Sequence, residues 1–190
     1  MKRLLIIFLL MAALLLLLAA CDSGVPADTT TEDTTIAAEV TDAPAETAAL
    51  VAEMTKDEPI DLIIASPLSR ALETGKAIQA ACGGVPLITD DRIREINFGD
   101  NEGRDTRDPD FQAEKRVFPR RHPNGESMLG FTHRIYGFLE DIRARYPDKV
   151  ILLACHNGIC RTAHSYFNDM TNEEFMSYVV KNAAVSIYEF

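Results

Sequence analysis

The sequence predicts an α/β fold in which a mostly parallel sheet is covered by helices. Short apolar runs typical of buried strands alternate with amphipathic segments of helical period, as at residues 60–65 and 68–81. Two of the predicted strands run directly into polar, kinked segments, which is where α/β proteins bind ligands. The chain has 190 residues, and this length allows one ordinary domain.

The N-terminus is predicted to be an export signal. Residues 4–20 form an unbroken apolar run behind a basic start, as in secretory signals. The Leu-Ala-Ala-Cys sequence that ends at Cys21 resembles the lipobox of bacterial lipoproteins. We expect residues 1–20 to be a lipoprotein signal peptide and Cys21 to be lipidated, so that the protein is extracytoplasmic and lipid-anchored to the bacterial cell membrane. An uncleaved transmembrane anchor is the alternative, because the run is at the short edge of what spans a bilayer.

The segment after the signal, residues 21–44, is predicted to be a disordered acidic tether. Thr, Asp, Ala and Pro dominate it, and none of its charges is positive. Such a segment buries too little apolar surface to offset its ordering entropy. The formal net charge of −10 also argues against a nucleic-acid partner, because phosphate backbones are bound by clustered bases.

The folded domain is expected over residues 45–190. A helix at 46–54 precedes a buried strand at 60–65, which a Ser-Pro pair ends. The helix at 68–81 has inward apolar positions and stops at two glycines. The remaining expected elements are a weak strand at 86–88, an amphipathic helix at 127–146, a strand at 150–154, a helix at 158–167 and a final strand at 185–188.

Residues 97–124 are predicted to be a long surface excursion, because Gly, Asp, Arg and Pro are abundant there. A loop of this length in a compact domain is usually functional. Its cations form either an anion-attracting lid or ordinary solvated loop charge; they are Arg104, Arg107, Lys115, Arg116, Arg120 and Arg121.

Residues with phosphate-binding chemistry follow two of the strands. Arg70 lies in the first turn of the helix after the strand at 60–65, and His156 lies where the strand at 150–154 meets its helix. A guanidinium fork and an imidazole beside helix N-terminal amides suit a phosphoryl group. Between them, Glu95 and Glu102 offer two carboxylates close to glycine-permitted turns.

Four stretches resemble, in the same order, motifs of the histidine phosphatase superfamily, which has the phosphoglycerate-mutase-like fold. The family's Ser-Pro-Leu-x-Arg-Ala-x-Glu-Thr motif matches residues 66–74, and its Pro-x-Gly-Glu-Ser motif matches residues 123–127. Its Glu-x-x-x-Gly-x-x-Glu-Gly motif matches residues 95–103, with Asn101 where tryptophan is usual. Its Ser-His-Gly-Gly-x-x-Arg motif becomes Cys-His-Asn-Gly-x-x-Arg over residues 155–161. The resemblance implies a three-layer sandwich with helices on both faces of the sheet.

The resemblance also implies phosphomonoester hydrolysis, acting on a phosphorylated small molecule without a cofactor or metal. Arg70 would bind the phosphoryl group, His156 would hydrogen-bond it, and Asn157 would lie at the phosphate-binding position beside them. Glu95 would be the general acid that protonates the leaving oxygen, a role that suits a carboxyl of raised pKa.

The Arg-His-Gly motif that ends the family's first strand is absent. No histidine precedes His122, and no arginine lies between Arg3 and Arg70. We therefore expect the first strand to be missing and hydrolysis to be impaired. Residues 36–40 are the upstream segment that could replace the strand, and His122 or His156 itself are the alternative nucleophiles. A non-catalytic phosphate-binding, anion-binding or interaction lipoprotein is the alternative function.

Overall fold

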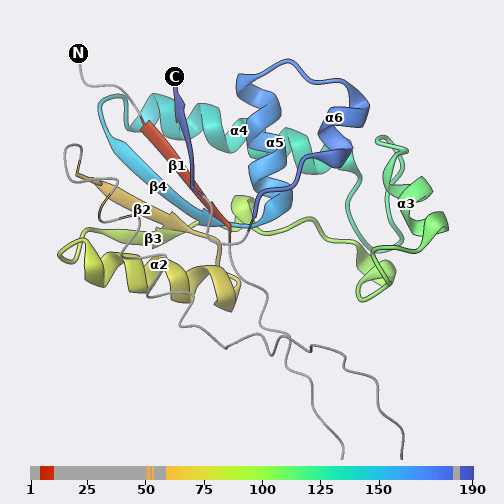
Figure 1. The fold of residues 1–190 in the computed structure, drawn as a ribbon, viewed down its shortest axis with the longest axis horizontal. Helices are drawn as coiled ribbons and strands as arrows, with labels where there is room; N and C mark the ends of the chain where they lie inside the picture. The colour runs from red at the N-terminus through yellow and green to blue at the C-terminus, as the bar shows by residue number, and fades with distance from the viewer. Residues whose placement is uncertain (1–4, 11–50, 52, 54–58, 182–184) are drawn as a thin grey trace, which may run out of the picture.

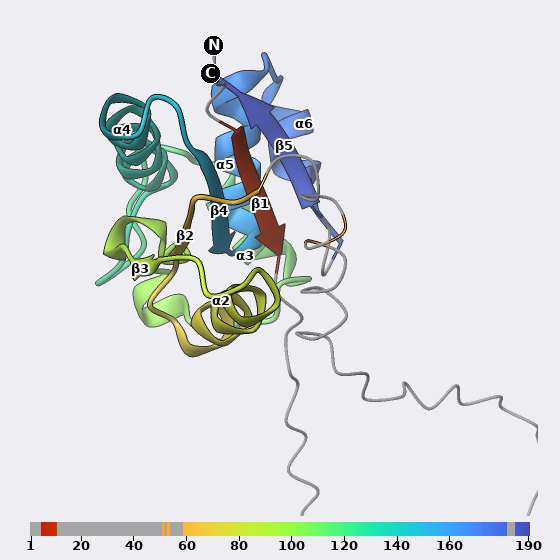
Figure 2. The ribbon, with the colours of Figure 1, turned by 90° about the vertical axis from the view of Figure 1, so that its left-hand side faces the viewer.

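The computed structural model describes residues 5–10, 51, 53, 59–181 and 185–190 (Figure 1). Five strands form one sheet in the order β3-β2-β4-β1-β5, and Figure 2 shows them side by side in this order. The strands are β1 (Leu5–Leu10), β2 (Leu62–Ala65), β3 (Leu87–Thr89), β4 (Val150–Cys155) and β5 (Val185–Glu189). All neighbouring pairs are parallel except β1 with β5, which is antiparallel.

Helices cover both faces of the sheet, as the sequence predicts for an α/β sandwich. The long helices are α2 (Ser69–Ala81), α4 (Met128–Arg145) and α5 (Asn157–Phe167), and the short ones are α3 (Pro109–Lys115) and α6 (Asn172–Ser177). Figure 1 shows α2 on one face and α4 with α5 on the other.

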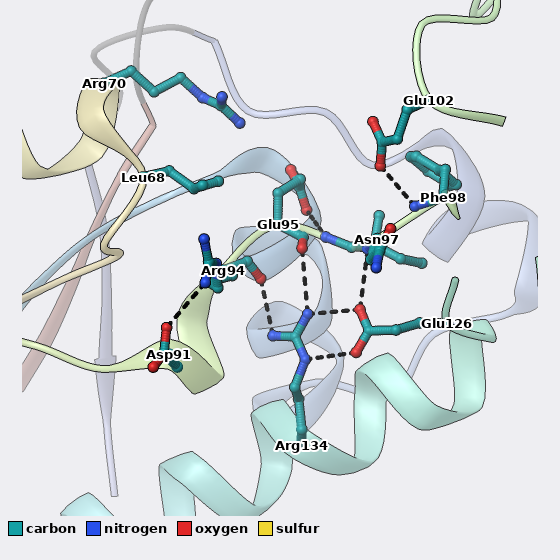
Figure 3. Close-up of a pocket in the computed structure, with 11 residues that line it drawn as sticks. Leu68, Arg70, Asp91, Arg94, Glu95, Asn97, Phe98, Glu102, Glu126 and Arg134 are labelled. Atoms are coloured by element: carbon teal, nitrogen blue, oxygen red, sulfur yellow. Dashed lines mark hydrogen bonds and ion pairs between the residues drawn. The ribbon is translucent and has the colours of Figure 1, made fainter. Parts of the chain in front are cut away.

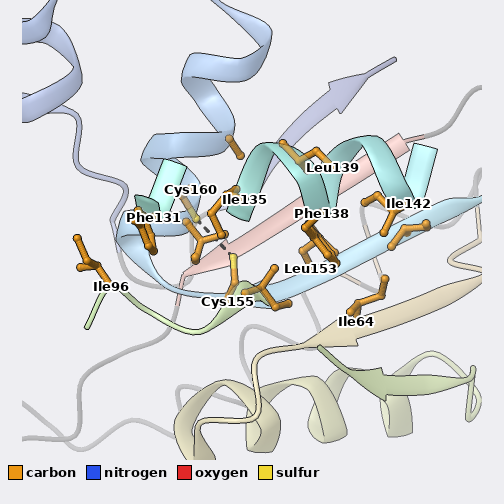
Figure 4. Packing of buried hydrophobic residues seen from close by; sticks show 14 of the residues in the cluster. Ile64, Ile96, Phe131, Ile135, Phe138, Leu139, Ile142, Leu153, Cys155 and Cys160 are labelled. Atoms are coloured by element: carbon orange, nitrogen blue, oxygen red, sulfur yellow. Dashed lines mark hydrogen bonds between the residues drawn. The ribbon is translucent and has the colours of Figure 1, made fainter. Parts of the chain in front are cut away.

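Two buried clusters hold these layers together. The larger cluster packs apolar side chains of α4 and α5, among them Phe131, Phe138 and Ile159, against alternate residues of β2 and β4 (Figure 4). The smaller cluster lies on the other face and packs Ile78 of α2 against the intervening strand residues, such as Ile63. Successive side chains of a strand point to opposite faces, so β2 and β4 contribute to both cores.

The first strand is not missing, which corrects the expectation from the sequence. Leu5–Leu10, from within the predicted signal peptide, forms β1 between β4 and β5. Its backbone register runs from Leu5 opposite Val150 to Leu10 opposite Cys155. An unbroken apolar run fits a buried strand in a parallel sheet as well as it fits a signal sequence, because both are apolar throughout.

Other expectations about the N-terminal segment remain predictions. Cys21, the tether at 21–44 and the candidate replacement strand at 36–40 lie outside the described residues, as does most of the predicted helix at 46–54. Val51, which is described, is helical and fully buried in the smaller core cluster. Within the described residues, no helix is long and apolar enough to span a bilayer.

The two short helices, α3 and α6, are not among the elements predicted from the sequence. The excursion at 97–124 contains α3, whose N-cap Asp108 accepts hydrogen bonds from the backbone N–H groups of Asp110 and Phe111. Helix α6 begins at a capping box in which Thr171 and Glu174 bond each other's backbone N–H groups. Both helices are too short for hydrophobic periodicity to reveal them, and their caps are the signals that could have been found.

Candidate phosphate-binding site

The predicted site residues gather at the carboxyl ends of β2 and β4. Ser66 follows β2, and His156 follows β4 as the N-cap residue of α5. The two strands are parallel neighbours, and the Ser66 backbone N–H donates to the Ala154 carbonyl at 2.9 Å. Adjacent parallel strands thus bring segments 90 residues apart in the sequence into contact.

His156 is held as a buried, neutral imidazole. Only 2% of its surface is exposed, and its Nε2 lies 2.8 Å from Ser66 Oγ. Burial lowers the pKa of His156 to about 4, and the positive charge of Arg70 adds to this effect. At neutral pH this imidazole can therefore donate one hydrogen bond and accept another, and a bound anion would favour its protonation.

Glu95 has the surroundings expected of a general acid. One carboxylate oxygen accepts from the Gly158 backbone N–H at 3.1 Å, and the other accepts from the Ile96 backbone N–H at 3.0 Å. Burial raises the pKa of Glu95, and this effect outweighs the two hydrogen bonds and the charges of Arg70 and Arg161. A carboxyl with a raised pKa holds a proton that it can donate to a leaving oxygen.

A cavity of about 600 Å³ is lined by both Arg70 and Glu95. Figure 3 shows the Arg70 side chain extending over this cavity from the start of α2. Among the described residues, no carboxylate forms an ion pair with Arg70. Its guanidinium is therefore available for an anionic ligand, as a phosphate-binding arginine must be.

Arg134 of α4, which is not among the site residues predicted from the sequence, positions the loop that carries Glu95. Its guanidinium forms a two-pronged ion pair with Glu126, at 2.9 and 2.8 Å. The same group donates to the backbone carbonyls of residues 94 and 95, at 2.9 and 3.3 Å (Figure 3). It also donates to the carbonyl of residue 92 at 2.5 Å. Arg134 lies eight residues from Glu126 and more than 35 from the loop, so no local sequence signal could have revealed this network.

Two glycine-containing loops fit together beside the network. Gly99 has a positive φ of 58°, and a side chain there would overlap the backbone of residues 123–125. Across the same contact, the Glu126 N–H donates to the Asn97 carbonyl at 2.8 Å. This close approach explains why glycine occupies position 99 in the acidic motif and position 125 in the Pro-x-Gly-Glu-Ser motif.

Asn157, predicted to lie at the phosphate-binding position, contacts the protein backbone. Its side-chain oxygen accepts from the Val180 backbone N–H at 3.1 Å, which ties the start of α5 to the segment after α6. It also borders a second cavity, of about 430 Å³, which shares Glu95, Ile96 and Phe98 with the lining of the first. Its phosphate-binding role stays a prediction.

No histidine of the described residues, His156 included, lines either of these two cavities. His122 is buried against the rings of Phe98 and Phe111, and its Nδ1 lies 3.1 Å from the Asn101 side-chain amide. His164 stacks on Tyr178 at 4.4 Å, and His133 is exposed on α4. The described part of the chain also contains no group of three side chains able to hold a metal ion.

The fold and these residues define an α/β protein with an anion site at the carboxyl ends of parallel strands. The chain belongs to the histidine phosphatase superfamily, branch 1, whose family model matches residues 35–190. This match begins after β1, whereas the structural matches described next cover nearly the whole chain.

Some relatives of the chain are named phosphatases and others probable phosphoglycerate mutases. The chain is 30% identical over 140 residues to the uncharacterized phosphatase PhoE of Bacillus subtilis, covering 73% of this chain and 68% of that one. It is 27% identical over 147 residues to phosphoserine phosphatase 1 of Hydrogenobacter thermophilus, covering 74% and 69%. The α-ribazole phosphatase of Shigella flexneri has the same fold, with a TM-score of 0.69 and 20% identity over 97% of this chain and 89% of that one.

A mycobacterial glucosyl-3-phosphoglycerate phosphatase, solved with inorganic phosphate, has a TM-score of 0.66 and 18% identity over 98% of this chain and 89% of that one. At this identity the likeness establishes the fold alone.

Proposed function

We propose that this protein binds phosphomonoesters at the carboxyl ends of β2 and β4 and that its hydrolysis of them is severely impaired. One observation carries the proposal: Arg70 and the high-pKa carboxyl of Glu95 line one cavity, and Glu95 accepts from the Gly158 N–H, two residues after the neutral His156. The phosphatase relatives and the phosphate complex of a structural neighbour support the ligand class.

The impairment is argued from the sequence at the end of β1. In the reaction implied by family membership, a histidine accepts the phosphoryl group and water then releases it. Leu10 pairs with Cys155, the residue before His156, so the end of β1 lies at the edge of the site. The chain continues from β1 as Met-Ala-Ala, which supplies no nucleophile and no titratable group.

Phosphate binding and turnover can be separated with the full chain. We expect inorganic phosphate to raise the thermal unfolding midpoint, because a ligand that binds only the folded state stabilises it. Arg70→Ala should remove this rise, whereas Lys76→Ala, an exposed change on the same helix, should keep it. Hydrolysis of 4-nitrophenyl phosphate should stay at background.

Two results would contradict the proposal. Robust hydrolysis by the unmodified chain would mean that the enzyme is active, and its loss in His156→Ala would assign the activity to this site. An unfolding midpoint unaffected by phosphate would exclude the binding function.

We also propose, from the sequence alone, that the chain is exported and lipid-anchored at Cys21. The support is the apolar run at 4–20 and the Leu-Ala-Ala-Cys sequence that follows it. Labelling cells with a radioactive fatty acid tests this proposal: label should enter the chain and be lost in Cys21→Ser.

A further inference from the structure

We propose that the second cavity is a subsite for a second anionic group, so that the ligand is a phosphomonoester whose alcohol part carries a carboxylate or another phosphate. This inference rests on the proposed phosphomonoester binding and names the class of ligand. The cavity lies between α3, the start of α5 and the segment after α6.

Two cations from different helices line the second cavity. Lys115 comes from the end of α3, and Arg161 comes from α5. Among the described residues, neither forms an ion pair with a carboxylate. Half-buried cations without a counter-ion are unfavourable in an empty cavity and are compensated when an anion binds between them.

The other contacts of these cations leave donors for a ligand. The Nε of Arg161 donates to the Tyr178 carbonyl at 3.1 Å, which fixes the side chain. The two terminal nitrogens of its guanidinium have no hydrogen-bond partner in the described part of the chain. Lys115 Nζ lies 4.8 Å from the Phe111 ring centre, a cation–π contact that uses none of its N–H donors in a hydrogen bond.

Electrostatics within the cavity agree with this arrangement. Burial, followed by the positive charges of Arg161 and Arg116, lowers the pKa of Lys115. Burial also lowers the pKa of Arg161, although the Glu95 carboxyl opposes this effect.

Thr162 provides an independent observation. It is fully buried, lines the same cavity, and its hydroxyl has no hydrogen-bond partner among the described residues. A buried hydroxyl without a partner costs free energy, so such groups commonly serve a ligand or a water molecule.

The other cations of the 97–124 excursion do not line either cavity, and two of them form ion pairs with carboxylates. Arg104 bonds Asp108 and Glu114, and Arg107 bonds Asp105. Of the six cations that the sequence suggested as an anion-attracting lid, Lys115 is the one that lines either cavity.

The position of Glu95 relates the two cavities to one ligand. A general acid must touch the ester oxygen, which joins the phosphoryl group to the alcohol part. Glu95 lines both cavities, with Arg70 in the first and Lys115 and Arg161 in the second. A ligand whose ester oxygen lies at Glu95 would therefore place its phosphoryl group near Arg70 and its alcohol part in the second cavity.

Three aryl phosphates with the same ring test the inference by calorimetric titration of the full chain. Phenyl phosphate has no second anion, 4-carboxyphenyl phosphate adds a carboxylate, and 1,4-phenylene bisphosphate adds a phosphate. We expect at least one of the two compounds with a second anionic group to bind roughly 10- to 100-fold more tightly than phenyl phosphate, because hydrogen bonds to charged groups contribute strongly. The compound with the larger gain identifies the anion that the subsite prefers.

Variants assign that preference to the second cavity. Lys115→Met and, separately, Arg161→Gln should bring the affinity ratio close to one while phenyl phosphate still binds. Arg107→Gln is the matched control, because it removes an exposed excursion charge outside both cavities and should keep the ratio. The Lys115 variant keeps the test decisive if Arg161→Gln fails to fold.

Two outcomes would overturn the inference. Equal affinity of the unmodified protein for all three compounds would exclude the anionic subsite and leave the proposed function intact. Binding of none of the three would overturn the proposed function and the subsite together.

Discussion

His156 shows how a single buried side chain links the site to pH. Its pKa is about 4 in the folded protein, whereas an exposed histidine has a pKa of roughly 6.5. As the pH falls from about 6.5 to 4, His156 binds a proton in the unfolded chain but not in the folded protein. Stability is therefore lost through this window, by on the order of 3 kcal/mol when complete.

NMR titration of the imidazole tests this prediction. Without ligand, the His156 signals should titrate well below pH 6, and saturating phosphate should move the midpoint upward because an anion favours the imidazolium. His133, which is exposed on α4, provides the comparison within the same sample. A His156 midpoint near 6.5 without phosphate would contradict the buried, neutral state.

Gly158 is the residue that makes room for the Glu95 carboxyl. A side chain at position 158 would overlap the carboxyl group, so Gly158→Ala should push Glu95 out of its buried position. Because burial is what raises the pKa of Glu95, we expect that pKa to fall toward the ordinary value for glutamate. Carbon-13 NMR of the carboxyl measures the change.

Gly137→Ala is the control for this substitution, because a side chain at position 137 on α4 would meet nothing within 4 Å. The Glu95 titration should not change in that variant. An unaltered Glu95 pKa in Gly158→Ala would mean that the loop adjusts without releasing the carboxyl.

At the scale of elements, β1 is the strand on which the sheet depends. It is paired on both sides, with β4 and with β5. A proline at Ile7 would remove a backbone N–H from the middle of this strand, where proline is not tolerated. We expect Ile7→Pro to lower the free energy of unfolding by roughly 2–5 kcal/mol.

Chemical denaturation followed by circular dichroism measures this loss. Thr30→Pro, a substitution in the predicted tether, is the matched control and should leave the denaturation midpoint unchanged. Equal midpoints for Ile7→Pro and the unmodified chain would show that β1 contributes nothing to stability in solution.

The elements that the sequence predicted best have long periodic patterns or clear boundaries. The helix expected at 127–146 is α4, Met128–Arg145, and the strand expected at 150–154 is β4. In the site, Arg70, Glu95 and His156 could be located because motifs and strand ends mark them. Arg134 and the second cavity depend on contacts between distant segments, which no local pattern contains.

The error at β1 has a different cause. An apolar run carries no periodicity that separates a buried strand from a signal sequence, so only its tertiary partners decide between them. The apolar run at residues 4–20 predicts an export signal over its whole length, which leaves the first strand of the sheet without a candidate among residues 1–20.

At the scale of the whole molecule, the predicted processing and the observed sheet cannot hold for the same chain. Cleavage before Cys21 would remove Leu5–Leu10 and with it the ladders on both sides of β1. We expect the protein purified from a bacterial cytoplasm, where the signal is retained, to unfold cooperatively. The lipidated form, beginning at Cys21, should lack a single cooperative transition.

Intact-mass measurement identifies which form is present, and calorimetry of each form measures cooperativity. The non-lipidated full-length Cys21→Ser chain is the control, because it blocks processing without touching β1. A cooperative transition in the form that begins at Cys21 would mean that another segment takes the place of β1.

The position of β5 has a consequence for the synthesis of the chain. Among the described strands, β5 pairs with β1 alone, so residues 185–189 dock on residues 5–10, which are synthesised long before them. Residues 5–10 must therefore remain accessible until residues 185–189 have been synthesised. Anything that sequesters residues 5–10 in the nascent chain, such as a targeting factor, would leave β5 without the strand on which it docks.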